Sequence, residues 1–245
     1  MNPVAFSIFG IDIMWYGILI STGVLIGIII SLRECRRIGF KEEDLLDFLL
    51  YAIPAAIIGA RAYYVIFSWE YYSQNLNQII NIRNGGLAIH GALMAGAAVS
   101  IVFCKKRKIN PWQILDIVIP SVALGQAIGR WGNFINQEAY GGPTELPWGI
   151  LVDGVKVHPT FLYESIIDFS IFVFLMWYRK NKRKNEGEVF SLYLILYSAG
   201  RFFVEGLRTD SLMFYNIRVA QLISVGLALM GAIIFIHLRK KRDII

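Results

Sequence analysis

The sequence predicts an all-α polytopic membrane protein with seven transmembrane helices, an N-terminus outside the cell and a cytoplasmic C-terminus. Of its 245 residues, 56% are hydrophobic and 17% are charged, whereas about 25% of the residues in an ordinary soluble domain are charged. Several apolar segments reach about 20 residues, the length that a helix needs to cross a bilayer core. This composition excludes a soluble globule, a disordered chain and a disulfide-rich scaffold.

The predicted spans follow one another along a single domain that covers residues 1–245. They are Ile13–Leu32, Leu45–Phe67, Leu87–Cys104, Trp112–Gly129, Phe161–Trp177, Val189–Val204 and Val219–Leu238. Two longer outer connections, at about 68–86 and 131–160, are rich in aromatic and polar residues. Loops of this length in a compact protein are often functional.

The basic residues predict the orientation of these spans. Most of the 24 Lys and Arg residues fall into four clusters, which begin at Arg33, Lys105, Arg179 and Arg239 and follow every second span. Because Lys and Arg accumulate in cytoplasmic loops, all four clusters are expected in the cytoplasm. The net charge of +6 arises from these clusters and does not indicate a surface that binds nucleic acid.

Three arginines, Arg61, Arg130 and Arg201, lie in or near the outer halves of the second, fourth and sixth spans. Each costs about 2.5–3.5 kcal/mol at mid-membrane, and charges inside spans are functional by default. Either each arginine pairs with a nearby carboxylate and braces the bundle, or all three bind a shared anionic ligand. Because a guanidinium donates two parallel hydrogen bonds to a phosphate, the second interpretation predicts a phosphate site at the outer face.

Span six carries a polar stripe. Tyr197, Arg201, Glu205 and Arg208 are spaced i, i+4, i+8 and i+11, so they are expected on one face of a helix. Lipid offers such a stripe no hydrogen-bonding partners, and the face must therefore meet protein or water. The same spacings permit ion pairs from Glu205 to both arginines, and these pairs are compatible with a role in binding.

A dense polar segment closes the fourth span on its outer side. Arg130 is followed by Asn133, Asn136, Glu138 and Gly141, which together predict a socket for a phosphate and a polyol. The glycines allow tight turns and a close approach of the backbone to a ligand. The alternative is a loop whose asparagines only cap helix ends.

His90 begins the third span near the outer interface and is one of only three histidines. Its side chain has the pKa best suited to proton transfer near neutrality, although a lone histidine is often structural. No pair of cysteines or histidines has the spacing of metal ligands, so we expect neither a metal nor an organic cofactor.

The segment from Gly129 to Gly141 resembles the signature of the bacterial prolipoprotein diacylglyceryl transferases, Gly-Arg-x-(Gly/Ala)-Asn-Phe-(apolar)-Asn-x-Glu-x-x-Gly, at every specified position. Further segments along the chain are similar to the family's other motifs. They are Trp15-Tyr16-Gly17, Gly59-Ala60-Arg61, Gly85-Gly86 to His90-Gly91, His158-Pro159-Thr160 to Tyr163-Glu164, and Arg201 to Glu205 with Arg208. The resemblance therefore covers most of the chain.

The resemblance implies an enzyme of the bacterial cytoplasmic membrane with its active site toward the outer face. Such an enzyme moves the diacylglyceryl group of phosphatidylglycerol to the cysteine thiol of a prolipoprotein lipobox, forms a thioether and releases glycerol phosphate. Its partners would be phosphatidylglycerol, prolipoprotein signal peptides and membrane lipids, with no nucleic acid. The nucleophile belongs to the substrate, which agrees with the expected cytoplasmic location of Cys35 and Cys104.

For this chemistry we expect His90, Arg130 and Arg201 to be catalytic, with His90 as the base for a thiol whose ordinary pKa is about 8.5. Arg130 would hold the lipid phosphate, because fixed charges aimed at a leaving group lower the barrier. The residues expected to bind or position substrate are Arg130, Asn133, Asn136, Glu138, Gly141, Tyr16, Arg61, Tyr197, Glu205 and Arg208. The alternative function is a transporter or flippase of an anionic lipid, which would also need polar residues through the cytoplasmic half.

Overall fold

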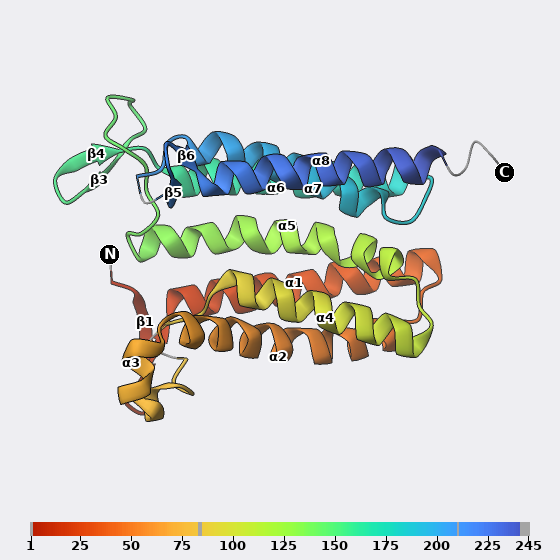
Figure 1. Cartoon of the computed structure of the whole chain (residues 1–245), viewed down its shortest axis with the longest axis horizontal. Coiled ribbons are helices and arrows are strands. Elements are labelled where there is room, and N and C mark those ends of the chain that lie inside the picture. The colour runs from red at the N-terminus through yellow and green to blue at the C-terminus, as the bar shows by residue number, and fades with distance from the viewer. Residues whose placement is uncertain (1, 83–84, 210, 241–245) are drawn as a thin grey trace. The chain divides into compact units, whose positions relative to one another are not determined.

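The computed structural model describes residues 2–82, 85–209 and 211–240 and is mostly helical (Figure 1). Its helices are α1 Trp15–Ile38, α2 Glu42–Phe67, α3 Trp69–Gln74, α4 Ile89–Arg107, α5 Pro111–Ile135, α6 Thr160–Asn181, α7 Glu188–Glu205 and α8 Val219–Lys240, with a 3₁₀ turn η1 at Leu76–Gln78. Each predicted span falls on one of the long helices. Residues 83–84 of the first outer connection, and Lys241 and Arg242 of the last basic cluster, lie outside the described residues.

Six helices of the described residues are long and apolar enough to cross a membrane. They are α1, α2, α4, α5, α6 and α8. Helix α7, which matches the sixth predicted span, is not among them because its 18 residues include the charged Glu188, Arg201 and Glu205. The structure thus agrees with a multi-pass membrane protein.

The expectation of a purely helical chain misses three hairpins among the described residues. They are formed by β1 Val4–Ile8 with β2 Ile11–Met14, β3 Ile150–Val152 with β4 Val155–Val157, and β5 Met213–Phe214 with β6 Ile217–Arg218. Asp153 and Gly154 between β3 and β4 have φ angles of 49° and 80°, as a two-residue type I′ turn requires. The predicted outer connection 131–160 is also partly helical, because α5 continues to Ile135.

The chain divides into two compact units, a larger one of Met1–Glu34 with Leu115–Ile245 and a smaller one of Cys35–Ile114. The core of the larger unit is an apolar cluster shared by α5, α6 and α7. It contains Ile119, Ala123, Ile171, Leu175, Tyr178, Val189, Tyr193 and Leu194. Helix α7 packs between α6 and α8, so its polar residues face protein on two sides.

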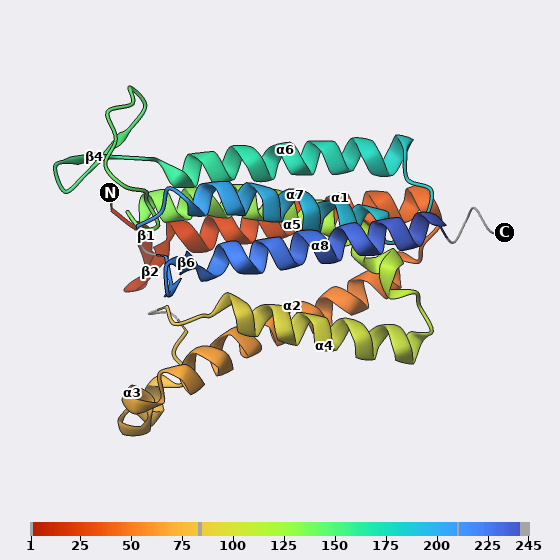
Figure 2. The same ribbon diagram turned by 45° about the horizontal axis from the view of Figure 1, so that its top comes forward.

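The helices of the larger unit have two distinct ends. Figures 1 and 2 show the hairpins β3–β4 and β5–β6 at the end where α6 and α8 begin, which we call the hairpin end. At the opposite end, the carboxylate of Asp116 accepts hydrogen bonds from the backbone N–H groups of Gly187 (2.8 Å) and Phe190 (2.9 Å) at the start of α7. Glu188, which is fully buried, accepts a 2.7 Å hydrogen bond from the Tyr178 hydroxyl there. These contacts fix the start of α7.

In the smaller unit, α2 and α4 pack closely through glycines. A Cβ atom placed on Gly91 would lie 2.1 Å from the carbonyl oxygen of Gly59, and one placed on Gly59 would lie 2.5 Å from Cβ of Ala95. Small residues at such a crossing let two membrane helices approach closely. Gly59 and Gly91 thus allow the close packing of α2 and α4, whereas a Cβ on Gly96 would meet open space.

We predict that Gly91→Ala lowers the stability of the smaller unit, because the added methyl group must push α2 and α4 apart. Overpacking of this kind typically costs about 1–3 kcal/mol. The matched variant Gly96→Ala adds the same methyl group to the same helix and should be neutral. The buried thiols of Cys35 and Cys104 provide the measurement, since maleimide should label them faster only in Gly91→Ala. Equal labelling rates in both variants would contradict the close contact.

Candidate active site

Arg130 lies near the end of α5, against two carboxylates of α6. Its Nη1 atom lies 3.1 Å from Oε2 of Glu164, and its Nε lies 4.0 Å from Oδ2 of Asp168. The two acidic residues are four positions apart on one face of α6. Both are buried, with relative exposures of 5% and 3%. A charged group at this depth is stable only when it is paired.

Glu164 also binds the guanidinium groups of two other arginines. Nη1 of Arg201 contacts Oε1 of Glu164, and Nη1 of Arg208 lies 3.9 Å from Oε2. Nη2 of Arg201 lies 2.6 Å from Oε2 of Glu205, the i+4 ion pair that the sequence permits. We call Arg130, Arg201 and Arg208, gathered around Glu164, the arginine cluster.

Arg208 reaches this cluster by a different route from the one expected. Helix α7 ends at Glu205, so Arg208 is not on the helical face predicted from the i+11 spacing. It instead forms a β-bridge with Gly141, and the N–H of Gly142 donates to the carbonyl of Leu207 at 2.9 Å. A Cβ on Gly141 would lie 2.8 Å from that same carbonyl oxygen. Gly141 thus allows the loop after α5 to approach the segment that carries Arg208.

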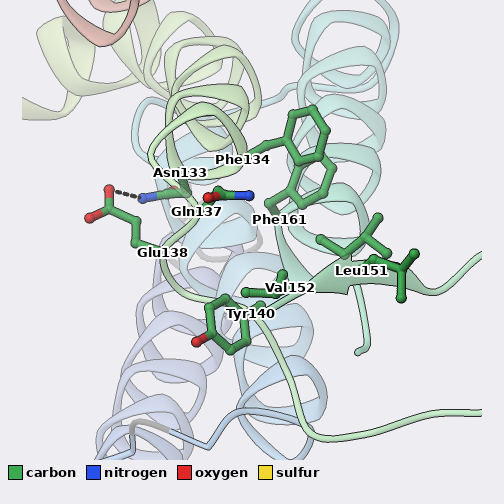
Figure 3. A pocket seen from close by; sticks show the side chains of 9 residues that line it. Asn133, Phe134, Gln137, Glu138, Tyr140, Leu151, Val152 and Phe161 are labelled. Carbon is green, nitrogen blue, oxygen red and sulfur yellow. Dashed lines mark hydrogen bonds between the residues drawn. The ribbon is translucent and has the colours of Figure 1, made fainter. Parts of the chain in front are cut away.

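The polar segment after Arg130 folds into a turn around Glu138. Its Oε1 atom accepts hydrogen bonds from the side-chain amides of Asn133 (2.9 Å) and Asn136 (3.3 Å). Gln137 and Ala139 have φ angles of 54° and 57°, which reverse the chain direction after the helix. Asn133 and Glu138 line a pocket of about 240 Å³ (Figure 3). The predicted socket residues are therefore brought together, with their amides already oriented by a carboxylate.

Two tyrosines predicted to line the site lie in the same unit. Tyr16 is in the first turn of α1 and lies against Gly132, where an added Cβ would come within 2.0 Å of the ring. Tyr197 is half-buried on α7 and stacks on Tyr193, with ring centroids 5.4 Å apart. Because Gly132 has no side chain, the Tyr16 ring can lie close to the last turns of α5.

We predict that Gly132→Ala destabilises the larger unit by about 1–3 kcal/mol, because the Tyr16 ring must move. Gly125→Ala on the same helix is the control, since a Cβ there meets nothing within 4 Å. The double variant Tyr16→Ala with Gly132→Ala should regain part of the loss, because the ring that clashes is gone. Thermal unfolding in detergent measures all three. A loss that the double variant does not recover would show that the Tyr16 contact is not its cause.

Arg61 and His90 belong to the smaller unit. Arg61 donates to the backbone carbonyls of Gln78 (2.5 Å), Ile79 (2.7 Å), Gly85 (3.1 Å) and Gly86 (2.9 Å). It therefore holds the described parts of the outer connection after α2. His90 is exposed at the start of α4, and its ring lies 5.8 Å from that of Tyr63.

Sequence reasoning did not select Glu164 or Asp168 as site residues. Glu164 was named only as the last residue of the segment from His158-Pro159-Thr160 to Tyr163-Glu164. Two carboxylates one turn apart in an apolar span are themselves a signal, because charges in spans need partners. The sequence predicted an external anion shared by Arg61, Arg130 and Arg201. The structure instead gathers Arg130, Arg201 and Arg208 around the carboxylate of Glu164.

Comparison with known proteins agrees with these features. The family model for prolipoprotein diacylglyceryl transferase matches residues 3–237. A protein of Finegoldia magna named phosphatidylglycerol–prolipoprotein diacylglyceryl transferase is 56% identical over 241 residues, which cover 98% of this chain and 97% of the relative. Proteins of the same name from Clostridioides difficile and Bacillus cereus are 56% and 50% identical, each over 98% of this chain and over 97% and 93% of the relatives. The chain therefore belongs to the prolipoprotein diacylglyceryl transferase family.

Proposed function

We propose that this enzyme transfers the diacylglyceryl group of phosphatidylglycerol to the lipobox cysteine of prolipoproteins. Family membership supports the reaction, and the names of the relatives support both substrates. The observation that carries the proposed site is the arginine cluster, in which three guanidinium groups gather at one buried carboxylate. It lies beside a turn whose amides can hold a polyol.

In the reaction, the cysteine sulfur forms a bond to the glyceryl carbon while the bond from that carbon to the phosphate oxygen breaks. The electron pair leaves with glycerol phosphate, and the thiol proton goes to a base. Arg130 and Arg201 would meet the charge that develops on the departing phosphate. Such fixed donors are commonly the largest contribution to catalysis. These steps account for every bond, electron pair and proton of the reaction without a cofactor.

Other residues would orient these groups. Glu205 fixes Arg201 by an ion pair, and Gly141 allows Arg208 to join the cluster. Asn133, Asn136 and Glu138 would bind the glycerol headgroup, and Tyr16 and Tyr197 would line the cavity. Arg61 would act by holding the outer connection after α2. His90 remains our candidate base, because an imidazole can accept a proton from the thiol and the residue is expected near the outer face.

We further propose that the chain is one seven-span domain, with the N-terminus outside and the C-terminus in the cytoplasm of a bacterial cell. The basic residues that end α6 and α8, including Arg179 and Arg239, support this orientation, because positive clusters mark the cytoplasmic side. They belong to the end of the larger unit opposite the hairpins (Figure 2). The hairpin end and the arginine cluster would then face outward.

The test is a purified enzyme mixed with phosphatidylglycerol and a synthetic lipobox peptide that contains one cysteine. We expect mass spectrometry to show a diacylglyceryl group on that cysteine. The same peptide with Cys→Ser should gain no mass, and phosphatidylethanolamine should be a far poorer donor. A folded enzyme that adds no mass to the peptide but moves phosphatidylglycerol between the leaflets of a liposome would instead be the transporter.

A further inference from the structure

The hairpin β3–β4 has one covered edge and one open edge. The covered edge belongs to β4, where the N–H of Thr144 donates to the carbonyl of Lys156 at 2.9 Å and Pro143 bridges to Val157. Lys156 lies opposite Leu151 in the hairpin. Because the backbone groups of Lys156 point away from β3, this pair is the non-hydrogen-bonded type. The N–H and C=O of Leu151 therefore point outward, and they have no strand partner among the described residues.

The pocket of about 240 Å³ lies beside this open edge. Its lining is mostly apolar, with all three residues of β3 and the stacked rings of Phe134 and Phe161, whose centroids are 4.6 Å apart. Figure 3 shows Asn133 and Glu138 on the side away from Leu151. Pockets that enclose a whole drug-sized ligand measure about 300–1,000 Å³, so this one suits a single large side chain.

We propose that β3 and this pocket bind the prolipoprotein in extended form, next to the cysteine that reacts; this inference rests on the proposed function. The substrate backbone would add a strand by pairing with Leu151, and one apolar side chain of the substrate would enter the pocket. This is the known mode of β-augmentation, in which backbone hydrogen bonds give affinity and pockets give specificity.

Two features favour a peptide over an acyl chain of the lipid. An acyl chain has no hydrogen-bonding groups and would leave the outward N–H and C=O of Leu151 unpaired, whereas an extended peptide satisfies both. The pocket also shares Asn133 and Glu138 with the turn that follows Arg130. Asn133 lies one helical turn after Arg130, on the same face of α5. A peptide bound there would present its cysteine beside the residues that hold the lipid headgroup.

The test compares two proline substitutions at opposite positions of the hairpin. Leu151→Pro removes the outward N–H without cutting a bond between β3 and β4, and proline is tolerated on an edge strand. Lys156→Pro makes the same change on the covered edge. We expect Leu151→Pro to raise the KM for the lipobox peptide about tenfold, with the KM for phosphatidylglycerol and kcat unchanged. Lys156→Pro should leave the KM for the peptide unchanged.

A second measurement avoids any change in the enzyme. Single N-methylation along the lipobox peptide removes one N–H at a time, and we expect one site near the cysteine to raise the peptide KM about tenfold with the wild-type enzyme. A uniform response along the peptide would overturn the proposal, as would a Leu151→Pro variant that raises the KM for phosphatidylglycerol instead. The failure of the proposed function is a separate outcome, because the wild-type enzyme would then modify no peptide.

Discussion

Replacing Arg130 by alanine should lower the rate of transfer about 100- to 1,000-fold, the range seen when one donor to a developing negative charge is removed. Arg130 lies near the end of α5 with its guanidinium against Glu164 and Asp168, so its position is fixed before substrate binds. Arg130→Lys keeps the charge but loses the planar fork that donates two parallel hydrogen bonds to phosphate. We expect this variant to remain strongly impaired.

The matched control for Arg130 is Arg239→Lys. Arg239 also pairs with a buried glutamate, Glu188 at 3.4 Å, and it donates to the Tyr178 hydroxyl at 2.8 Å. It lies at the end of α8, opposite the hairpin end. We expect Arg239→Lys to keep near-normal transfer. Full activity of Arg130→Lys would remove the need for a bidentate contact, and full activity of Arg130→Ala would remove Arg130 from the site.

Replacing Glu164 by glutamine should lower both stability and transfer. Glu164 is 5% exposed and is the carboxylate that Arg130, Arg201 and Arg208 share. Breaking a buried ion pair by removing one partner costs about 3–5 kcal/mol, because the other charge is left uncompensated. Three guanidinium groups without their common partner repel one another and lose the arrangement in which they meet the phosphate.

Glu188→Gln is the control that separates the effect of Glu164 on stability from its effect on transfer. Glu188 is fully buried in the same unit and binds Tyr178 and Arg239 at the opposite end of α7. Both variants should unfold at lower temperature in detergent. At a temperature where both are folded, only Glu164→Gln should have lost most of its transfer activity. Equal activities of the two variants would mean that Glu164 stabilises the fold and does not position the arginines.

The sequence predicted the long helices well, because a helix that crosses the bilayer core needs an apolar run of about 20 residues, which is easy to see in a sequence. The hairpins were missed although one carried a clear local signal. Asp153-Gly154 stands between two runs rich in β-branched residues, and such a dipeptide is the strongest short-range sign of a hairpin. The dipeptide lies in the outer connection 131–160, for which no strand was expected.

The site was predicted in part. The turn formed by Asn133, Asn136 and Glu138 is local, so neighbouring residues in the sequence were enough to identify it. Glu164 is 34 to 44 positions from the arginines that it binds, and no spacing rule links residues on different helices. Arg208 was correctly predicted to lie near Arg201, but the reason given was wrong. Helical periodicity no longer applies at Arg208, because α7 ends at Glu205.

The most direct test of the central claim, that the phosphate departs as the leaving group when sulfur attacks carbon, is isotopic. Phosphatidylglycerol would carry ¹⁸O at the oxygen that joins its diacylglyceryl carbon to phosphorus. If sulfur attacks that carbon, all of the ¹⁸O leaves with glycerol phosphate, in equal amount to the diacylglyceryl groups found on the peptide cysteine. Recovery of ¹⁸O in free diacylglycerol, with phosphoglycerol attached to the cysteine, would show attack at phosphorus and would contradict the claim.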